Sequence, residues 1–445
     1  MKQRRWWPSN RLLGWLLAAL VIYGLVSIWT SERLVVYRIF AGRANIVLED
    51  GHVVALAYPN ETGLCNPIST LVDFYRQVGS GSQHYPAVSA QLYKWKKAYD
   101  RRYLDPRGSS FYRGCHINQL PPEIGRLTHL RRLDLWGCRN LVLPPEIGRL
   151  SRLELLNLNN NQLVALPPEI GQLANLRGLF LRGIYRTPGG LTDLPPEIGQ
   201  LSQLETLQLD RNELIRLPPE IGQLKNLRRL DVSHNYLTDL PPEIGQLQRL
   251  EVFVVSFNSL TELPPEIGQL SQLRELYLAG GIGQPGPLTN LPPEIGHLSR
   301  LEVLNLYNNS LLSLPPEIGR LTRLRRLEVV SNSLTRLPPE IGHLAKMNQL
   351  IISHNRVADL PPEIGQLAGL ENLVLDHNQL TTLPPELAKL TNLKHLYLEG
   401  NRLTQLPEGL GRLAQLESLH LAGNYLTQLP PGLEAFTLAP QRSRQ

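Results

Sequence analysis

The sequence is dominated by one segment, Leu-Pro-Pro-Glu-Ile-Gly-Gln-Leu, which is first complete in this form at residues 166–173 and returns in near copies to the end of the chain. The interval between successive copies is constant except after Pro167 and after Pro264, where it is longer. A fixed period of this length predicts a solenoid, in which each unit buries its apolar face only against its neighbours. The usual estimate of two or three domains from a chain of 445 residues therefore does not apply.

Charge is distributed unevenly along the chain. Residues 1–120 hold 15 Lys and Arg against 7 Asp and Glu, whereas the rest of the chain holds 30 against 32. A nearly neutral array argues against a nucleic-acid groove along the repeats. The three cysteines are too few for a disulfide framework and are not spaced like zinc ligands. We expect no metal, no cofactor and no small-molecule substrate.

Residues 1–30 have the pattern of a membrane anchor. Basic residues precede an uncharged run over 12–29, which as a helix would span about 27 Å, close to the ~30 Å hydrocarbon core. A cleaved signal peptide is the alternative, but the run is long and residues 27–31 offer no good pair of small side chains. We predict a cytoplasmic tail and a signal-anchor helix within residues 1–30. The excess of basic residues before the helix favours an array on the extracytoplasmic side.

Residues 31–109 predict a small α+β cap over the first repeat. Apolar runs at 44–48 and 52–58 flank Glu49-Asp50-Gly51, which predicts a hairpin with an Asp-Gly turn. Helices are expected at 66–79 and 91–104, the first opened by Asn-Pro. Solenoids need such caps for solubility.

A cysteine hydrolase is an alternative for the same region, because Cys65 lies near several histidines. The sequence has no nucleophile elbow, no signature around Cys65 and no assignable orienting carboxylate. We therefore predict that the protein is not an enzyme.

The repeat reads Leu-x-x-Leu-x-Leu-x-x-Asn-x-Leu-x-x-Leu-Pro-Pro-Glu-Ile-Gly-x-Leu, as in the stretch from Leu204 to Gly222. This pattern resembles the leucine-rich repeat, specifically the 23-residue Leu-Pro class of Ras-pathway and cell-polarity scaffolds and plant resistance-type receptors. The resemblance covers roughly residues 110–433, with 13 Leu-x-x-Leu-x-Leu segments in one register after a degraded first unit. It implies an α/β solenoid, a horseshoe with a parallel sheet on the concave face and short helical turns on the convex face, working as a protein-recognition surface.

Inward-facing residues explain the rest of the consensus. The leucines stack on their copies in the next coil, and each asparagine amide satisfies backbone groups that the bend leaves unpaired. Cys138 occupies an asparagine slot and Cys115 lies one repeat period earlier. A disulfide between these two cysteines is sterically feasible, but ladder side chains run parallel, so we expect two free, buried thiols. The ladder asparagines are Asn161, Asn212, Asn235, Asn258, Asn309, Asn332, Asn355, Asn378, Asn401 and Asn424.

The variable strand positions are where specificity can reside, because the leucines are committed to the core. Exposed aromatic and apolar side chains there are typical interface anchors. The alternative is that they pack on one another and bind nothing. The predicted partner-binding residues on the concave face are Phe180, Arg182, Val254, Phe257, Tyr277, Tyr307, Ile351, Val374 and Tyr397.

The two longer repeat units carry their insertions at the same place, within 183–190 and 280–287. Both insertions should loop out at one rim, with Tyr185 and Arg186 at the tip of the first. His354 and His377 occupy equivalent positions in adjacent units, but a metal site would need at least a third ligand, so we expect solvated histidines. Residues 434–445 are a short C-terminal cap or tail.

Together these patterns predict a single-pass membrane protein whose repeat array binds a protein or peptide on its concave face, without catalysis. A carbohydrate or cell-wall binder is the alternative, because aromatic side chains and Asn or Asp on one sheet would serve that function too.

Overall fold

The computed structural model describes residues 26–31, 34–39, 44–49, 52–57, 119–120, 122–138, 140–184, 187–281 and 284–436. These residues belong to two compact units, 1–191 and 192–445. Among them, no helix has the length and apolar character needed to span a bilayer.

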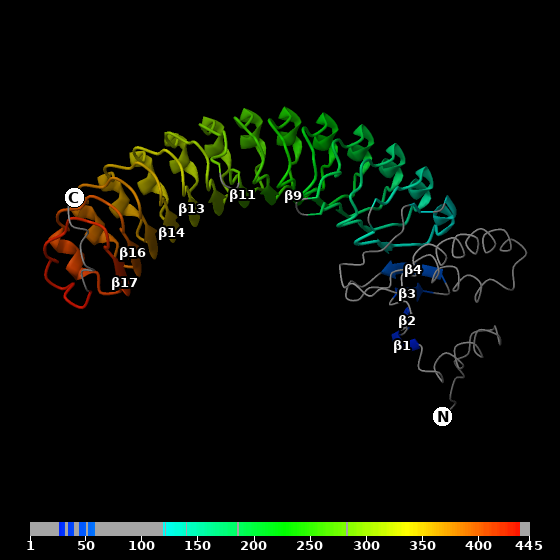
Figure 1. Cartoon of the computed structure of the whole chain (residues 1–445), viewed down its shortest axis with the longest axis horizontal. Helices are drawn as coiled ribbons and strands as arrows, with labels where there is room; N and C mark the ends of the chain where they lie inside the picture. Colours follow the sequence, from blue (N-terminus) through cyan, green and yellow to red (C-terminus); the bar gives the residue numbers. More distant parts are fainter. Residues whose placement is uncertain are drawn as a thin grey trace, which may run out of the picture. The chain divides into compact units, whose positions relative to one another are not determined.

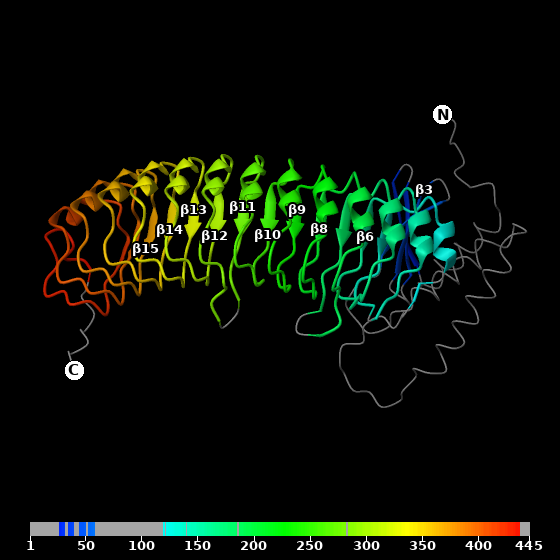
Figure 2. The ribbon, with the colours of Figure 1, turned by 90° about the horizontal axis from the view of Figure 1, so that it is seen from above.

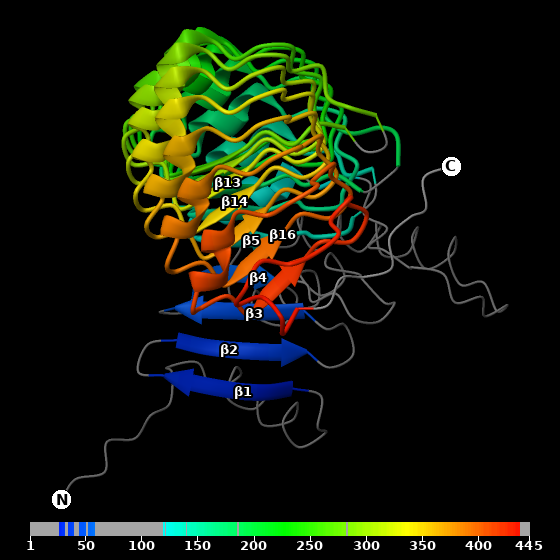
Figure 3. The same ribbon diagram turned by 90° about the vertical axis from the view of Figure 1, so that its left-hand side faces the viewer.

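The first unit contains a run of four antiparallel strands, visible as the blue arrows in Figure 3. They are β1 (Val26–Ser31), β2 (Leu34–Ile39), β3 (Ala44–Glu49) and β4 (His52–Ala57). β3 and β4 pair where the sequence predicts a hairpin, and β4 pairs in parallel with β5 (Arg132–Asp134). The strands β1 to β4 therefore cover the edge of β5. An uncovered strand edge could pair with another chain.

The helix predicted over 12–29 is wrong at its C-terminal end. Residues 26–29 belong to β1, which pairs in register with β2. The sequence Val-Ser-Ile-Trp-Thr is rich in β-branched and aromatic side chains that favour strands, and an apolar run is ambiguous between helix and strand. The other part of the predicted anchor, 12–25, lies outside the described residues, as do the helices predicted at 66–79 and 91–104.

Each repeat forms one coil, consisting of a three-residue strand and a five-residue 3₁₀ turn on the opposite side. In the first unit the remaining strands are β6 (Leu155–Asn157) and β7 (Gly178–Phe180), and the turns are η1 (Pro122–Arg126), η2 (Pro145–Arg149) and η3 (Pro168–Gln172).

The second unit continues the same alternation. Its strands are β8 (Thr206–Gln208), β9 (Arg229–Asp231), β10 (Val252–Val254), β11 (Glu275–Tyr277), β12 (Val303–Asn305), β13 (Arg326–Glu328), β14 (Gln349–Ile351), β15 (Asn372–Val374), β16 (His395–Tyr397) and β17 (Ser418–His420). Its turns are η4 (Pro196–Gln200), η5 (Pro219–Gln223), η6 (Pro242–Gln246), η7 (Pro265–Gln269), η8 (Pro293–His297), η9 (Pro316–Arg320), η10 (Pro339–His343), η11 (Pro362–Gln366), η12 (Pro385–Lys389) and η13 (Glu408–Arg412).

Adjacent strands of the second unit pair in parallel with equivalent residues opposite one another, as Leu230 lies opposite Phe253. The strands line the inner side of this unit's curve and the 3₁₀ turns its outer side (Figure 1). The repeated leucines and the isoleucine or leucine of each turn point between these two layers, and most are fully buried. The predicted parallel-sheet solenoid with short helical turns is confirmed.

The asparagine ladder is also confirmed, and Asn235, Asn258, Asn355, Asn378, Asn401 and Asn424 share one hydrogen-bonding pattern. The side-chain oxygen of Asn235 accepts the Leu214 N–H at 3.0 Å, and its amide nitrogen donates to the Leu209 and Val232 carbonyls at 3.0 and 2.9 Å. One side chain thus satisfies three backbone groups of two coils, all of them buried. At the start of the ladder, Cys138 is a free, buried thiol, and its backbone N–H donates to Asn161. Cys115 lies outside the described residues.

Candidate functional site

The strand face of each coil exposes side chains at fixed positions, which are numbered from the first leucine of the consensus. Strands cover positions 3 to 5, so leucine 4 points inward while positions 3 and 5 point away from the core. Positions 2, 7 and 8 border the strand at its two ends. Because the register is exact, side chains at one position form a row along the sheet, about 4.8 Å apart from coil to coil.

Position 5 brings together two groups of the predicted binding residues. Val254 lies opposite Tyr277 across β10 and β11, and Ile351, Val374 and Tyr397 follow one another across β14, β15 and β16. All five are half-buried. Asn305 and Glu328 stand between the two groups in the same row. The second unit therefore carries two apolar segments separated by polar side chains rather than one continuous stripe.

The other predicted residues occupy different places. Phe180 is half-buried on β7 and Arg182 is half-buried just after it, both in the first unit. Phe257 is at position 8, where the backbone has a φ of 59°, and its ring stacks on His234 with centroids 4.3 Å apart. Tyr307 is at position 7 and is 43% exposed. The tip residues Tyr185 and Arg186 lie outside the described residues.

Tyr277 has the most developed polar surroundings of the position 5 residues. Its hydroxyl donates to the Glu275 carboxylate at 3.0 Å. Burial, followed by the hydrogen bond and charge of Glu275, raises the pKa of the tyrosine hydroxyl above 10.0. The neutral hydroxyl is therefore held in place as a donor, with the ring presented at the sheet surface.

The second insertion extends from one edge of the sheet, in the coil of β11 (Figure 2). The side chain of Asn308 donates to the carbonyls of Gly281 and Gln284, the latter at 3.0 Å. Gly286 donates to the Asn308 carbonyl at 2.8 Å. These bonds fasten both ends of the loop to the following coil.

Position 2 carries a row of alternating charge that the sequence-based prediction missed. Ion pairs join adjacent coils along it, including Arg228 with Glu251 at 2.5 Å, Arg274 with Glu302 at 2.8 Å, and Lys394 with Glu371 at 2.8 Å. The signal was present in the sequence as opposite charges one repeat apart. The row reads Glu205, Arg228, Glu251, Arg274, Glu302, Arg325, Asn348, Glu371, Lys394, Glu417 in the second unit.

The coils of β14 to β17 contain a histidine-rich part of the strand face. His354 and His377 stack with ring centroids 4.4 Å apart, and His420 stacks on Tyr397 at 4.5 Å. Burial, and then the neighbouring His377, lowers the pKa of His354 below 6.5. Within the described part of the chain, no group of three or more His, Cys, Asp or Glu residues is arranged to hold a metal ion.

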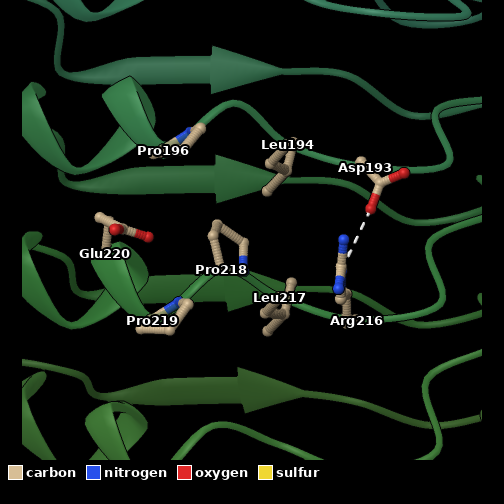
Figure 4. Close-up of a pocket in the computed structure, with 8 residues that line it drawn as sticks. All are labelled: Asp193, Leu194, Pro196, Arg216, Leu217, Pro218, Pro219 and Glu220. Atoms are coloured by element: carbon tan, nitrogen blue, oxygen red, sulfur yellow. Dashed lines mark hydrogen bonds and ion pairs between the residues drawn. The ribbon is translucent and has the colours of Figure 1, made fainter.

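A depression of about 300 Å³ lies between two neighbouring coils of the second unit (Figure 4). An exposed ion pair crosses it, with Arg216 Nε 3.4 Å from Asp193 Oδ1. Its walls are the repeated Leu-Pro-Pro-Glu segments, so its shape follows from the repeat itself. Its lining residues are Asp193, Leu194, Pro196, Arg216, Leu217, Pro218, Pro219 and Glu220. We assign it no function.

Sequence comparisons agree with this architecture. Family models described as leucine-rich repeats match residues 102–194, 225–280, 300–321 and 368–426. A leucine-rich-repeat protein of Leptospira interrogans is 38% identical over 70% of this chain and 89% of its own, with a TM-score of 0.48. The fold and these matches define a repeat solenoid. The chain belongs to the leucine-rich-repeat family. The comparison with curated proteins gives no match.

Two further solved structures are similar. The plant peptide hormone receptor RGFR1, solved in complex with RGF2, is 29% identical, with 70% of this chain and 55% of that chain covered and a TM-score of 0.53. Toll of Drosophila, solved in complex with Spätzle, is 19% identical and shows the fold alone, with 96% and 57% covered and a TM-score of 0.61. The present chain spans little more than half the length of those two chains.

Proposed function

We propose that this protein is a non-catalytic recognition module that binds a protein or peptide partner on the strand face of its repeat array. One observation carries the proposal. The core is already filled by leucine, yet further apolar side chains lie on the side of the strands that faces away from the core, namely Val254, Tyr277, Ile351, Val374 and Tyr397. Half-buried aromatic and aliphatic side chains on a rigid sheet lose little conformational entropy on binding.

The similarity to RGFR1 supports a peptide or protein as the partner, since that protein is a peptide hormone receptor solved in complex with RGF2. A rigid scaffold with variable side chains in regular rows suits recognition of an extended surface. The location outside the cytoplasm remains a prediction. Protease accessibility of the array in intact cells would test it, because a cytoplasmic array would be protected.

Tyr277 and Tyr307 lie in the neighbouring coils of β11 and β12 on the proposed binding surface. Replacing both by alanine is expected to weaken capture of a partner by about 30-fold or more, because buried aromatic anchors contribute about 2 kcal/mol or more when truncated. Crosslinking of the full chain followed by mass spectrometry would identify the partner, and titration with that partner would measure the loss.

The matched control for these tyrosines is Tyr425→Ala. Tyr425 is 44% exposed, as Tyr307 is at 43%, but it lies after the ladder asparagine and away from the strand. Its replacement should leave the affinity within about twofold. Unchanged binding in the Tyr277/Tyr307 variant would remove the strand-face assignment, and selective binding to glycans would favour a carbohydrate ligand instead.

A further inference from the structure

The strand face of the second unit is not uniform in charge. In the coils of β8 to β13, positions 2, 3, 5, 7 and 8 hold seven carboxylates against six arginines, a balance of −1. In the coils of β14 to β17 the same positions hold four carboxylates against one lysine, a balance of −3. The C-terminal four coils are therefore acidic relative to the rest of the same face. The carboxylates are those of Glu371, Asp376, Glu399 and Glu417, and the lysine is Lys394.

The excess negative charge borders the apolar row. Lys394 is paired with Glu371 at 2.8 Å on one side of the strands. On the other side, one carboxylate oxygen of Asp376 accepts the Glu399 backbone N–H at 2.7 Å, and Glu399 contacts His420 Nδ1 at 3.2 Å. Among the described residues neither Asp376 nor Glu399 forms an ion pair with Arg or Lys. Two carboxylates thus lie beside Val374 and Tyr397 without a permanent counter-charge.

Four histidines share these coils. His354 and His377 are stacked at position 8, His395 is at position 3 of β16 and His420 is at position 5 of β17. The His395 Nδ1 atom is buried without a hydrogen-bond partner. Each imidazole that carries a proton adds one positive charge to a face whose balance is otherwise −3. Acidification acts on Asp376 in the same direction, because burial raises the pKa of its carboxyl group.

We infer that the strand face of the coils of β14 to β17 is a docking site for a partner segment that combines basic and apolar side chains, and that acidification releases this segment. Apolar side chains of the partner cover Ile351, Val374 and Tyr397, and Lys or Arg side chains pair with Asp376 and Glu399. The neutral histidines permit this pairing near pH 7, whereas imidazolium ions on the same face repel a basic segment at about pH 5. The inference rests on the proposed function and adds to it the location, the partner chemistry and the pH dependence.

Three short fluorescein-labelled peptides of equal length test the partner chemistry with the full chain. One combines leucine with arginine, the second leucine with glutamate, and the third serine with arginine. Fluorescence anisotropy at about pH 7.5 should show binding of the leucine–arginine peptide, at least about tenfold tighter than either of the others. Equally tight binding of the serine–arginine peptide would mean that charge alone attracts the peptides, which would contradict the apolar part of the site. Equally tight binding of the leucine–glutamate peptide, or no binding of any peptide, would overturn the inference.

Charge-neutral variants locate the site. Asp376→Asn with Glu399→Gln should weaken binding of the leucine–arginine peptide by about tenfold, as expected for two partly exposed ion pairs. The control, Glu205→Gln with Asp231→Asn, removes two carboxylates from the same face in coils outside the site and should change affinity by less than about twofold. Equal loss in both variants would contradict the assignment. Crosslinks of a captured partner near Tyr277, with no peptide bound at these coils, would sink this inference and leave the proposed function standing.

The pH dependence provides a separate prediction. The leucine–arginine peptide should lose about tenfold or more in affinity between pH 7.5 and about pH 5, because histidine side chains gain positive charge as the pH falls through this range. A variant with His354, His377, His395 and His420 all replaced by asparagine should retain most of its affinity at the lower pH, while circular dichroism and urea unfolding verify that it is folded. An equal loss on acidification in this variant would refute the role of the histidines.

Discussion

Gly319→Ala is expected to destabilise the repeat array by about 2 kcal/mol, within the range found for overpacked cores. A Cβ atom added at Gly319 would lie only 2.5 Å from the Glu340 carbonyl oxygen of the next coil and 2.7 Å from its Cβ atom. Replacing glycine by alanine at an unhindered site normally stabilises by about 0.4–1 kcal/mol, so the steric term should reverse the sign. Urea unfolding of the two proteins would measure the difference.

The chain itself contains the matched control for this contact. In η12 the glycine is replaced by Ala388, and in the following coil the glutamate that would meet its Cβ atom is replaced by Gly409. A Cβ atom added at Gly409 would lie 2.7 Å from the Ala388 Cβ atom. The side chain that fills the space between these two coils therefore comes from Ala388, and the facing residue, Gly409, has no side chain.

A double-mutant cycle at Ala388 and Gly409 tests this explanation. Gly409→Glu alone should cost about 1–3 kcal/mol, whereas the same change together with Ala388→Gly recreates the arrangement of the other coils and should recover most of that loss. Amide hydrogen exchange in η13 would report the local effect, because repeat arrays need not unfold in two states. Equal costs with and without Ala388→Gly would show that the close approach between coils is not the cause.

Asn378→Ala is expected to cost about 3–5 kcal/mol. The Asn378 side chain accepts the Val357 N–H at 3.1 Å and donates to the Ile352 and Leu375 carbonyls at 2.9 and 3.0 Å. Alanine would leave three backbone groups buried without partners, each costing about 1–3 kcal/mol, with partial relief by relaxation or water. Chemical denaturation, together with hydrogen exchange of the adjoining coils, would measure the loss and locate it.

Asn392→Ala is the matched control for the ladder. The Asn392 side chain also donates to a backbone carbonyl of the previous coil, that of Ala368 at 2.7 Å, but it does so at the surface. Water can replace that bond, so the expected cost is below about 1 kcal/mol. A similar cost for both replacements would mean that the ladder asparagines contribute no more than surface asparagines do.

The repeat period alone predicted most of the array. It indicated which leucines are buried, which residue forms the ladder and where the turns lie, because each of these is a property of one coil copied many times. It also placed Val254, Tyr277, Ile351, Val374 and Tyr397 on strands. The N-terminal region lacked such repetition, and there an apolar run that ends in β1 was interpreted as a helix throughout.

The sequence did not predict which variable side chains act together. Phe257 was expected beside Val254 on the concave face, but nothing in the sequence indicated that it lies just after β10, with a positive φ and its ring stacked on His234. His395 and His420 were not singled out, and the charge alternation at position 2 was overlooked. These relations join residues about one repeat apart through their side chains, so they depend on conformation as well as on register.

The amino-acid sequence by itself determined the solenoid, its buried leucines and its asparagine ladder, because the apolar positions and the asparagine recur at the same place in every coil. The repeat register also placed Asn305 and Glu328 between the two apolar groups of the position 5 row. Only the tertiary structure decided that the exchange of Ala388 and Gly409 compensates a contact between coils, and that His234 and Phe257 stack. The physical reason is that packing between neighbouring coils depends on side-chain volume, direction and charge at distances of a few ångströms, which a linear period does not specify.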